Sequence, residues 1–369
     1  MLKLLHLGDM HLCSAFSAFS PRAAATRRAR QFEALEKTVD RAKEMGAQML
    51  LFAGDCFDTQ TPDADAVRRF FSLLLDSALP TVIVPGNHDY YRAGGFWDSV
   101  PLPKNVHLFR ENTVTCVRFP ALDTVVYGYA FTDEIHDAPT LPRRDELLLA
   151  GTSILLAHAD LLSPLSPYAP IASGALAASG LSYAALGHVH NPPEARRFGD
   201  TLAAYSGFLT GRGFDETGAG RANFVEIDGA RVKITPIAVE GDRFEIRTLD
   251  CTGMPSGEAL RAHVADFLKG EDLPHGTALR LLLTGEVSEA CTPDTVALSR
   301  LGEALALFEV RDGTVPLYDA DFLEKDQGLR GAFYRAMEKR LHSRDPAERE
   351  LAAKALRFGF AALSGREIL

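Results

Sequence analysis

The chain has 369 residues, 46% of them hydrophobic and 24% charged, and a formal net charge of −10. This composition excludes a disordered or fibrous chain, and the length favours one large domain plus a smaller one. No apolar run is long enough to span a bilayer, and Asp9 and His11 interrupt the apolar start before a signal peptide could form. We therefore expect a cytoplasmic protein that does not associate with membranes.

The cysteines are scattered and odd in number, and no two of them form a CxxC pair. This pattern argues against a disulfide framework and against a zinc site built from thiolates. Cys13 and Cys56 lie next to candidate metal ligands. We expect both to be small buried thiols rather than metal ligands.

The acidic net charge is not typical of a nucleic-acid-binding protein, because binding to phosphate backbones depends on Lys and Arg. The first 30 residues differ: their only acidic residue is Asp9, and their basic residues are Lys3, Arg22, Arg27, Arg28 and Arg30. Such a cluster is either the solvated face of a helix, the more frequent case, or a set of phosphate contacts.

Strands and helices alternate in the first hundred residues. Apolar runs of strand length occupy residues 2–7, 49–53 and 81–84. The first helix is predicted to follow a polar loop rich in Ala and Ser, and the second to start at Thr61-Pro62. The apolar stripe of the first helix consists of Phe32, Leu35, Val39 and Ala42. This order predicts parallel βαβ units.

The pattern changes after residue 105. Short alternating runs between residues 106 and 129 predict antiparallel strands and hence a mixed or doubled sheet. Further strands are expected at 153–157, 183–186, 201–205, 223–227 and 232–237. Beyond about residue 240, strand and helix patterns continue without ligand-type residues at the strand ends, which predicts a second domain. A final helix is expected to start at Asp345-Pro346.

One stretch organises the candidate site. Residues 49–58, MLLFAGDCFD, place Asp55 just after a buried strand, and Gly54 allows the chain to turn sharply there. Counting this strand, five strands end in residues of ligand type, which are Asp9, His11, Asp55, Asn87, His158, His188 and His190. Sites in open α/β sheets form at the carboxyl ends of the strands, so we expect these residues to converge.

Imidazole nitrogens combined with carboxylate and amide oxygens, without thiolates, suit Mn, Fe or Zn in a hydrolytic site. We interpret Asp55 as the shared ligand of two divalent ions. The remaining ligands of one ion would be Asp9, His11 and His190, and those of the other would be Asn87, His158 and His188. A pair of ions of this kind can hold both the attacking hydroxide and the phosphoryl oxygens of a phosphate ester.

His88 and Asp89 have no metal role in this scheme and are the candidate catalytic residues. His88 follows the ligand Asn87, and an imidazole placed there can protonate the leaving oxygen. We expect Asp89 to orient the His88 ring.

These motifs together resemble a known family. Asp9-x-His11, Gly54-Asp55, Gly86-Asn87-His88-Asp89, His158 and Gly187-His188-Val189-His190 look like the full motif set of the calcineurin-like metallophosphoesterases. The resemblance covers residues 1 to about 240. It implies an α/β fold with a four-layer α/β/β/α core and a two-metal site.

A narrower resemblance is to the DNA repair exonucleases of the SbcD/YhaO type. It rests on LHLGDMHL, on Arg28 ahead of the first helix, on AGDCFDTQTP, and on residues 205–227, which are similar to a stretch that links core and capping domain in this group. Residues 307–337 and 355–369 look like the tail of the YhaO-like subgroup. Asp58 stands where several nuclease relatives have His.

The resemblance implies a Mn-dependent phosphodiesterase that cleaves DNA ends, with Fe and Zn as alternative metals. The expected domains are a nuclease core at 1–239, a smaller α+β capping domain at 240–330 that selects the substrate, and a C-terminal helical segment at 331–369. The alternatives are a phosphoesterase for a nucleotide or cyclic nucleotide, and an adaptor for a coiled-coil ATPase. The sequence leaves open the native metal, exonuclease versus endonuclease action and the oligomeric state, for which a homodimer is one alternative.

Overall fold

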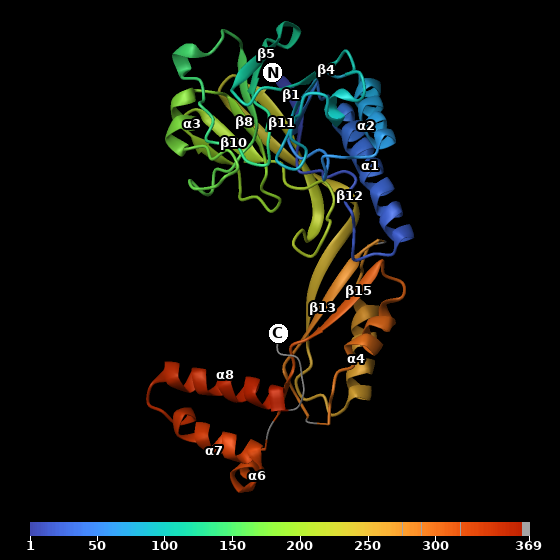
Figure 1. Ribbon diagram of the computed structural model, residues 1–369, viewed down its shortest axis with the longest axis vertical. Helices are drawn as coiled ribbons and strands as arrows, with labels where there is room; N and C mark the ends of the chain where they lie inside the picture. Colours follow the sequence, from blue (N-terminus) through green and yellow to red (C-terminus); the bar gives the residue numbers. More distant parts are fainter. Residues whose placement is uncertain (275, 289, 318, 364–369) are drawn as a thin grey trace. The chain divides into compact units, whose positions relative to one another are not determined.

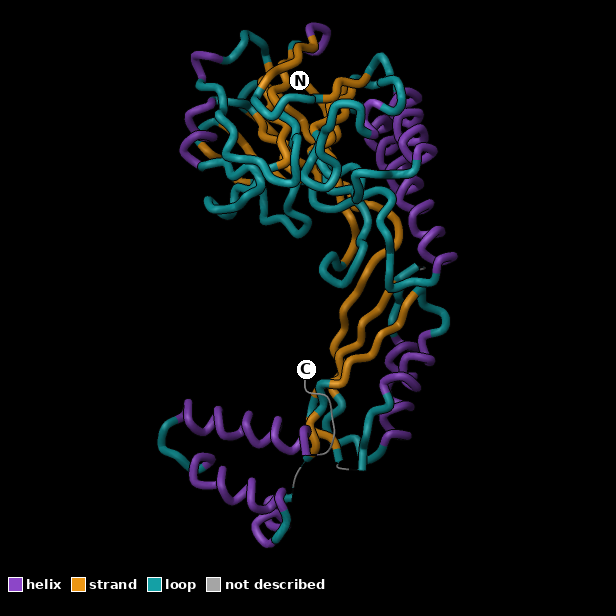
Figure 2. Tube along the Cα trace, in the orientation of Figure 1, coloured by secondary structure: helices purple, strands orange, loops and turns teal. Residues whose placement is uncertain are grey.

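The computed structural model describes residues 1–274, 276–288, 290–317 and 319–363. The chain forms two compact units, Met1–Arg243 and Phe244–Leu369, which Figures 1 and 2 show as ribbon and trace. The end of the predicted C-terminal segment, residues 364–369, lies outside the described residues. Among the described helices, none combines the length and the apolar character needed to cross a membrane.

The first unit contains two sheets. One has the order β4-β3-β2-β1-β11, with β12 beside β11. Its strands in the first unit are β1 (Leu2–Leu7), β2 (Met49–Ala53), β3 (Thr81–Val84), β4 (Val106–Leu108) and β11 (Gly218–Asp228). The other sheet consists of β5 (Thr115–Phe119), β6 (Thr124–Gly128), β7 (Thr152–His158), β8 (Tyr183–Gly187), β10 (Thr201–Tyr205) and β9 (Arg196–Phe198), in that spatial order.

Successive side chains of a strand point to opposite faces of its sheet, and they form three separate apolar clusters. Leu4 and Leu51 point between the two sheets and pack against Ile154 of the other sheet. Their neighbours Leu5 and Leu50 point to the opposite face and pack under α1 (Pro21–Glu44) and α2 (Ala64–Ser77). The outer face of the second sheet packs against α3 (Ser173–Ser179). The predicted four-layer α/β/β/α core is thereby confirmed.

Both helix starts differ from the prediction. The polar loop before α1 is shorter than expected: the hydroxyl of Ser20 accepts from the Ala23 amide at 3.3 Å, Pro21 takes the first turn, and the Ala-rich residues that follow are helical. Arg28 therefore lies within α1 rather than ahead of it. The cap of α2 is Asp63, not Thr61, because the Asp63 carboxylate accepts from the Asp65 amide at 2.7 Å.

The predicted antiparallel pairing holds for β5 and β6 and fails for β4. β4 pairs in parallel with β3, because residues 85–105 carry the chain back along the sheet before β4 begins. The short 3-10 helix η1 (Phe96–Asp98) belongs to this crossover. The others are η2 (Pro120–Leu122), η3 (Arg144–Glu146) and η4 (Arg300–Gly302).

The chain passes into the second unit within the long strand β12 (Arg231–Asp250). Its end pairs in parallel with β13 (Ala278–Thr284), which pairs in parallel with β15 (Leu307–Asp312). The intervening helices α4 (Gly257–Gly270) and α5 (Thr295–Ser299) pack on this sheet. A two-stranded ladder of β14 (Glu286–Val287) and β16 (Val315–Pro316) follows, and the last helices are α6 (Ala320–Lys325), α7 (Leu329–Leu341) and α8 (Pro346–Leu363).

Candidate metal centre

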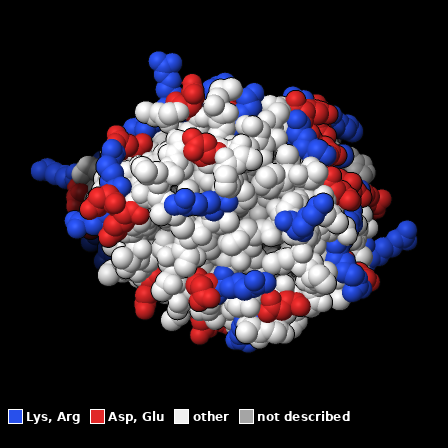
Figure 3. All heavy atoms as spheres, turned by 90° about the horizontal axis from the view of Figure 1, so that it is seen from above, with Lys and Arg blue, Asp and Glu red and all other residues white. Residues whose placement is uncertain are grey.

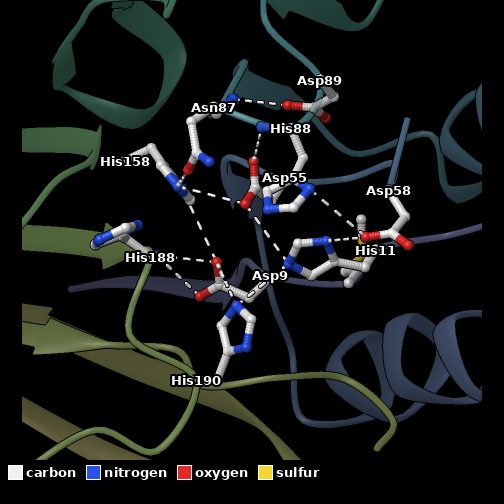
Figure 4. Close-up of polar contacts among 12 residues, drawn as sticks. Asp9, His11, Asp55, Asp58, Asn87, His88, Asp89, His158, His188 and His190 are labelled. Carbon is white, nitrogen blue, oxygen red and sulfur yellow. Dashed lines mark hydrogen bonds and ion pairs between the residues drawn. The ribbon is translucent and has the colours of Figure 1, made fainter. Parts of the chain in front are cut away.

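The predicted site residues come from five strand ends of the first unit, and Figure 4 shows most of their side chains gathered around Asp9 and Asp55. Asp9 and His11 follow β1, Asp55 follows β2 and Asn87 follows β3. His158 is the last residue of β7, while His188 and His190 follow β8. The structure thus brings residues that are far apart in the sequence to one edge of the two sheets.

Several of these residues have an unusual backbone conformation. Asp9, His11, Asp55 and His188 have φ values of 49°, 43°, 48° and 100°. Positive φ in a residue other than glycine costs on the order of 1–3 kcal/mol, so neighbouring loops must hold it. The amides of Asp9 and His11 donate to the carbonyl oxygens of Gly54 and Asp55, at 3.1 and 2.9 Å. Such stored strain is typical of a functional site.

Asp55 lies at the centre of the cluster. Its Oδ2 is 3.5 Å from His11 Nε2 and 3.5 Å from His158 Nε2, and its Oδ1 accepts from the His88 amide at 2.9 Å. Burial alone would raise the pKa of Asp55, but the nearby imidazoles and this hydrogen bond lower it to about 2. A charged carboxylate between two groups of histidines is the arrangement that a shared ligand requires.

On one side of Asp55, two imidazoles face each other. His11 Nε2 and His190 Nε2 are 3.2 Å apart, and Asp9 Oδ1 is 3.9 Å from His190 Nε2. The Nδ1 atom of each ring lies beside a carboxylate, Asp58 at 2.9 Å for His11 and Glu216 at 2.7 Å for His190. A ring that donates from Nδ1 presents a lone pair at Nε2, so both lone pairs point into the same space. A cation fits there.

The other side shows the same chemistry. His158 Nδ1 donates to the carbonyl oxygen of Ala53 at 3.0 Å, so its Nε2 presents a lone pair. This lone pair faces Asn87 Oδ1 at 2.9 Å, which is also an acceptor. Two acceptors at this distance repel each other unless a cation lies beside them. The side chains present therefore fit a pair of divalent ions with N and O ligands.

His188 fits this pattern less closely than predicted. Its backbone amide donates to both carboxylate oxygens of Asp9, at 2.9 and 3.0 Å. Its ring packs edge-on against His158 and beside Tyr168, with centroid distances of 5.1 and 4.9 Å. Burial lowers the pKa of His188 to about 4, which leaves a neutral ring. Within the described part of the chain, the convergent groups of His, Cys, Asp and Glu do not include it.

His88 lies at the open edge of the cluster. Its side chain is 46% exposed, and its ring packs edge-on against His11 with a centroid distance of 4.8 Å. Burial of the rest of the ring lowers the pKa of His88. The acid paired with the ring is Asp58, whose Oδ1 is 3.7 Å from His88 Nδ1.

The expectation that Asp89 orients His88 is wrong. The Asp89 carboxylate is fully buried and accepts from three backbone amides, those of Gly86 and Cys56 at 2.7 Å and of Phe57 at 3.2 Å. It therefore fastens the loop after β3 to the loop after β2. Burial and the charge of Asp55 raise the pKa of Asp89 to about 8, although the three donors favour its ionised form.

Three further residues belong to the site, and we call Asp58, Arg212 and Glu216 the charged brace. Arg212 donates to Asp58 Oδ1 at 2.8 Å and to Glu216 Oε1 at 2.5 Å. Burial raises the pKa of Glu216, but its hydrogen bonds with His190 and Arg212 outweigh this and lower it to about 2. The only signal for Arg212 and Glu216 in the sequence was the resemblance over residues 205–227, because no strand or helix covers residues 206–217.

Not all of the basic residues near the amino terminus belong to a solvated helix face, and not all of them are available to contact phosphate. Arg27 is only 3% exposed and lies 4.1 Å from the centroid of the Phe19 ring. Arg27 and Arg30 pair with Asp242, at 3.6 and 2.8 Å. The two cysteines beside the site also differ, since Cys56 is buried as predicted and Cys13 is only partly buried.

The comparison with known protein families decides the identity of the fold. The family model described as calcineurin-like phosphoesterase matches residues 2–192, more than half of the chain. The chain belongs to the calcineurin-like phosphoesterases. It is accordingly a metal-dependent hydrolase of phosphate esters, and the clustered side chains described above are its candidate ligands for divalent metals.

Individual relatives of this calcineurin-like phosphoesterase include one protein named for DNA repair and one named as part of a nuclease. It is 25% identical over 300 residues to the uncharacterized metallophosphoesterase YhaO of Bacillus subtilis, covering 78% of this chain and 73% of YhaO. It is 24% identical to the DNA double-strand break repair protein Mre11 of Methanopyrus kandleri, covering 71% of this chain and 62% of that protein. For the SbcD component of the Bacillus subtilis nuclease SbcCD the identity is 25%, over 59% of this chain and 64% of SbcD. The chain spans less than two thirds of the latter two.

Proposed function

We propose that this calcineurin-like phosphoesterase is a two-metal phosphodiesterase that hydrolyses DNA phosphodiester bonds, with Mn as its metal. The observation that carries the proposal is the position of Asp55, whose Oδ2 lies 3.5 Å from an imidazole nitrogen on each side. Support for DNA as substrate comes from Mre11 and SbcD, which are named as a DNA double-strand break repair protein and as part of a nuclease.

In this proposal each metal position has its own residues. Asp9, His11 and His190 would hold one ion, Asn87 and His158 with the neighbouring His188 would hold the other, and Asp55 would be common to both. When bound, two divalent ions supply an activated hydroxide and neutralise the charge that develops on the phosphoryl oxygens.

The protein side chains move the remaining proton. His88 is the general acid that we propose, because its ring is half exposed at the edge of the cluster while its Nδ1 side faces Asp58. Its other nitrogen, Nε2, remains for the leaving oxygen. Proton transfer by a positioned side chain contributes typically ~10²–10⁴-fold to the rate.

Two alternatives have observations in their favour. The net charge of −10 favours a small substrate such as a nucleotide or cyclic nucleotide. Figure 3 views the molecule from the end where the N-terminus lies in Figure 1, and acidic and basic side chains are interspersed there around a largely uncharged centre. The second alternative is an adaptor for a coiled-coil ATPase, which follows from the resemblance to a component of a nuclease complex. Clustered metal ligands argue against a purely structural role.

The test combines elemental analysis of the purified protein with Mn-supplemented assays on labelled single- and double-stranded DNA and on a chromogenic phosphodiester. A DNA enzyme that contacts several phosphates loses affinity steeply as salt is added, whereas a small-substrate enzyme does not. Cleavage of DNA with this salt dependence supports the proposal. Turnover of the chromogenic ester without DNA cleavage refutes it in favour of a small substrate.

A further inference from the structure

The two halves of the metal centre differ in the groups that hold their imidazoles. His11 and His190 have Nδ1 against the carboxylates of Asp58 and Glu216, at 2.9 and 2.7 Å. His158 has Nδ1 against a neutral acceptor, the carbonyl oxygen of Ala53 at 3.0 Å. A negatively charged acceptor makes the stronger hydrogen bond and increases the electron density that the ring offers to a metal at Nε2.

Arg212 joins the two carboxylates into one unit. Its guanidinium contacts both oxygens of Glu216, at 2.5 to 3.2 Å, and Asp58 Oδ1 at 2.8 Å. The Glu216 side chain is only 1% exposed and that of Arg212 is 19% exposed. A buried carboxylate needs a charged partner to remain ionised, and Arg212 supplies it for Glu216 while fixing Asp58 in the same contact.

We infer that Arg212 and Glu216 are positioning residues that give the Asp9–His11–His190 position a higher metal affinity than the Asn87–His158 position. The inference rests on the proposed function for the assignment of these ligands. The charged brace contacts the Nδ1 side of both rings, and the two Nε2 atoms lie 3.2 Å apart, facing the same point. The other position has an amide ligand, and its imidazole is oriented by a carbonyl.

The experiment is a titration of the metal-stripped full-length chain with Mn²⁺ alone, with free Mn²⁺ followed by electron paramagnetic resonance. The wild type is expected to bind two ions in two unequal steps. Glu216→Gln and Arg212→Met should weaken the tighter step by about 10–100-fold, the usual effect of losing a partner of a metal-binding histidine, and leave the weaker step unchanged. Asn87→Ala should weaken only the weaker step, which assigns the steps to the positions.

Two controls separate positioning from folding. Arg221→Lys changes another partly buried arginine of the same segment, which donates to the carbonyl oxygens of Ser206 and Tyr205, and should leave both steps unchanged. Asp58→Asn removes the more exposed carboxylate of the brace and should weaken the same tighter step as Glu216→Gln. This second variant keeps the inference testable if Glu216→Gln does not fold.

Equal affinities in the wild type would overturn the inference. Equal weakening of both steps by Glu216→Gln, or a tighter step unchanged within twofold in both Glu216→Gln and Asp58→Asn, would overturn it as well. Because no substrate is present, the result is independent of the DNA assays. A chain that binds two ions unequally and cleaves no DNA refutes the proposed substrate and leaves this inference intact.

Discussion

His88 is the residue whose position most directly links the cluster to a reaction. It is 46% exposed, whereas His11, Asp55 and His158 are buried, so it can reach a substrate without displacing the core of the site. Its ring is held by His11 and Asp58 rather than by Asp89, which binds backbone amides. In the proposed mechanism, the buried residues would hold the metals and the exposed His88 would donate the proton.

We predict that His88→Ala retains bound Mn but lowers turnover of a phosphodiester by about 10²–10⁴-fold, because it removes the proposed proton donor and no metal ligand. Elemental analysis and steady-state assays measure the two effects. His263→Ala, which changes a histidine on α4 in the second unit, should leave both unchanged. Unchanged cleavage by His88→Ala would contradict the assignment.

His6 makes a separate prediction about stability. It is fully buried on β1, where its ring contacts the Tyr183 hydroxyl at 2.9 Å, and burial lowers its pKa to about 3. The unfolded chain has the ordinary pKa of about 6.5, so between these values it binds a proton that the folded chain does not. Stability therefore falls as the pH is lowered through this window, by up to about 1.4 kcal/mol per pH unit from this group.

His6→Gln should remove this contribution, so that the free energy of unfolding of the variant falls less steeply with acidification, by about one proton. Urea unfolding of the metal-free protein at several pH values between about 4 and 6.5 measures the slope. Parallel curves for His6→Gln and the wild type would show that His6 is not the titrating group.

At the scale of elements, the site depends on close contact between the ends of strands. Gly187 at the end of β8 lies against the end of β2, so close that an added Cβ would overlap the carbonyl oxygen of Ala53. That oxygen is also the acceptor that orients His158. The packing of Gly187 against β2 and the orientation of the His158 ring therefore depend on the same atom, the carbonyl oxygen of Ala53.

Gly187→Ala should lower the free energy of unfolding by about 1–3 kcal/mol, the usual cost of forcing extra atoms into a packed region, and should weaken Mn binding. Gly174→Ala is the matched control, since a Cβ there meets no described atom outside its own stretch of α3 within 4 Å. It should be neutral or slightly stabilising in a helix. Thermal unfolding and Mn titration of both variants give the comparison, and equal behaviour would contradict this shared dependence.

Periodicity and composition predicted the strand positions and the convergence of their ends well, because short apolar runs such as residues 49–53 have few alternative structures in a buried sheet. These sequence patterns failed where contacts between residues far apart in the chain determine the structure. The direction of β4 depends on the crossover before it, and Asp89 accepts from the amide of Cys56, 33 residues away in the sequence. Arg212 and Glu216 lie in a segment without periodicity, so no local pattern could assign them to the site.

At the scale of the whole molecule, the residues named above for the candidate metal centre all lie in the first unit, Met1–Arg243. The second unit has its own apolar cores, one under α4 and one among α6, α7 and α8. In our proposal, the first unit therefore carries the catalytic residues, and residues 240–330 select the substrate.

This separation predicts that residues 1–243 expressed alone hydrolyse a chromogenic phosphodiester with Mn at a rate within a few fold of the full chain, but lose most of their cleavage of labelled DNA. Assays of both substrates with both proteins measure the effect. A truncated protein that is folded and cleaves DNA as well as the full chain would contradict substrate selection by the second unit.

The proposed two-metal centre depends above all on Asp55 as a carboxylate common to both metal positions. Equilibrium dialysis of wild type and Asp55→Asn against Mn²⁺, followed by elemental analysis and with circular dichroism to verify the fold, tests this directly. We predict two ions per chain in the wild type and none in the variant at the same free Mn²⁺ concentration. A folded variant that keeps either ion at full occupancy would contradict a shared ligand.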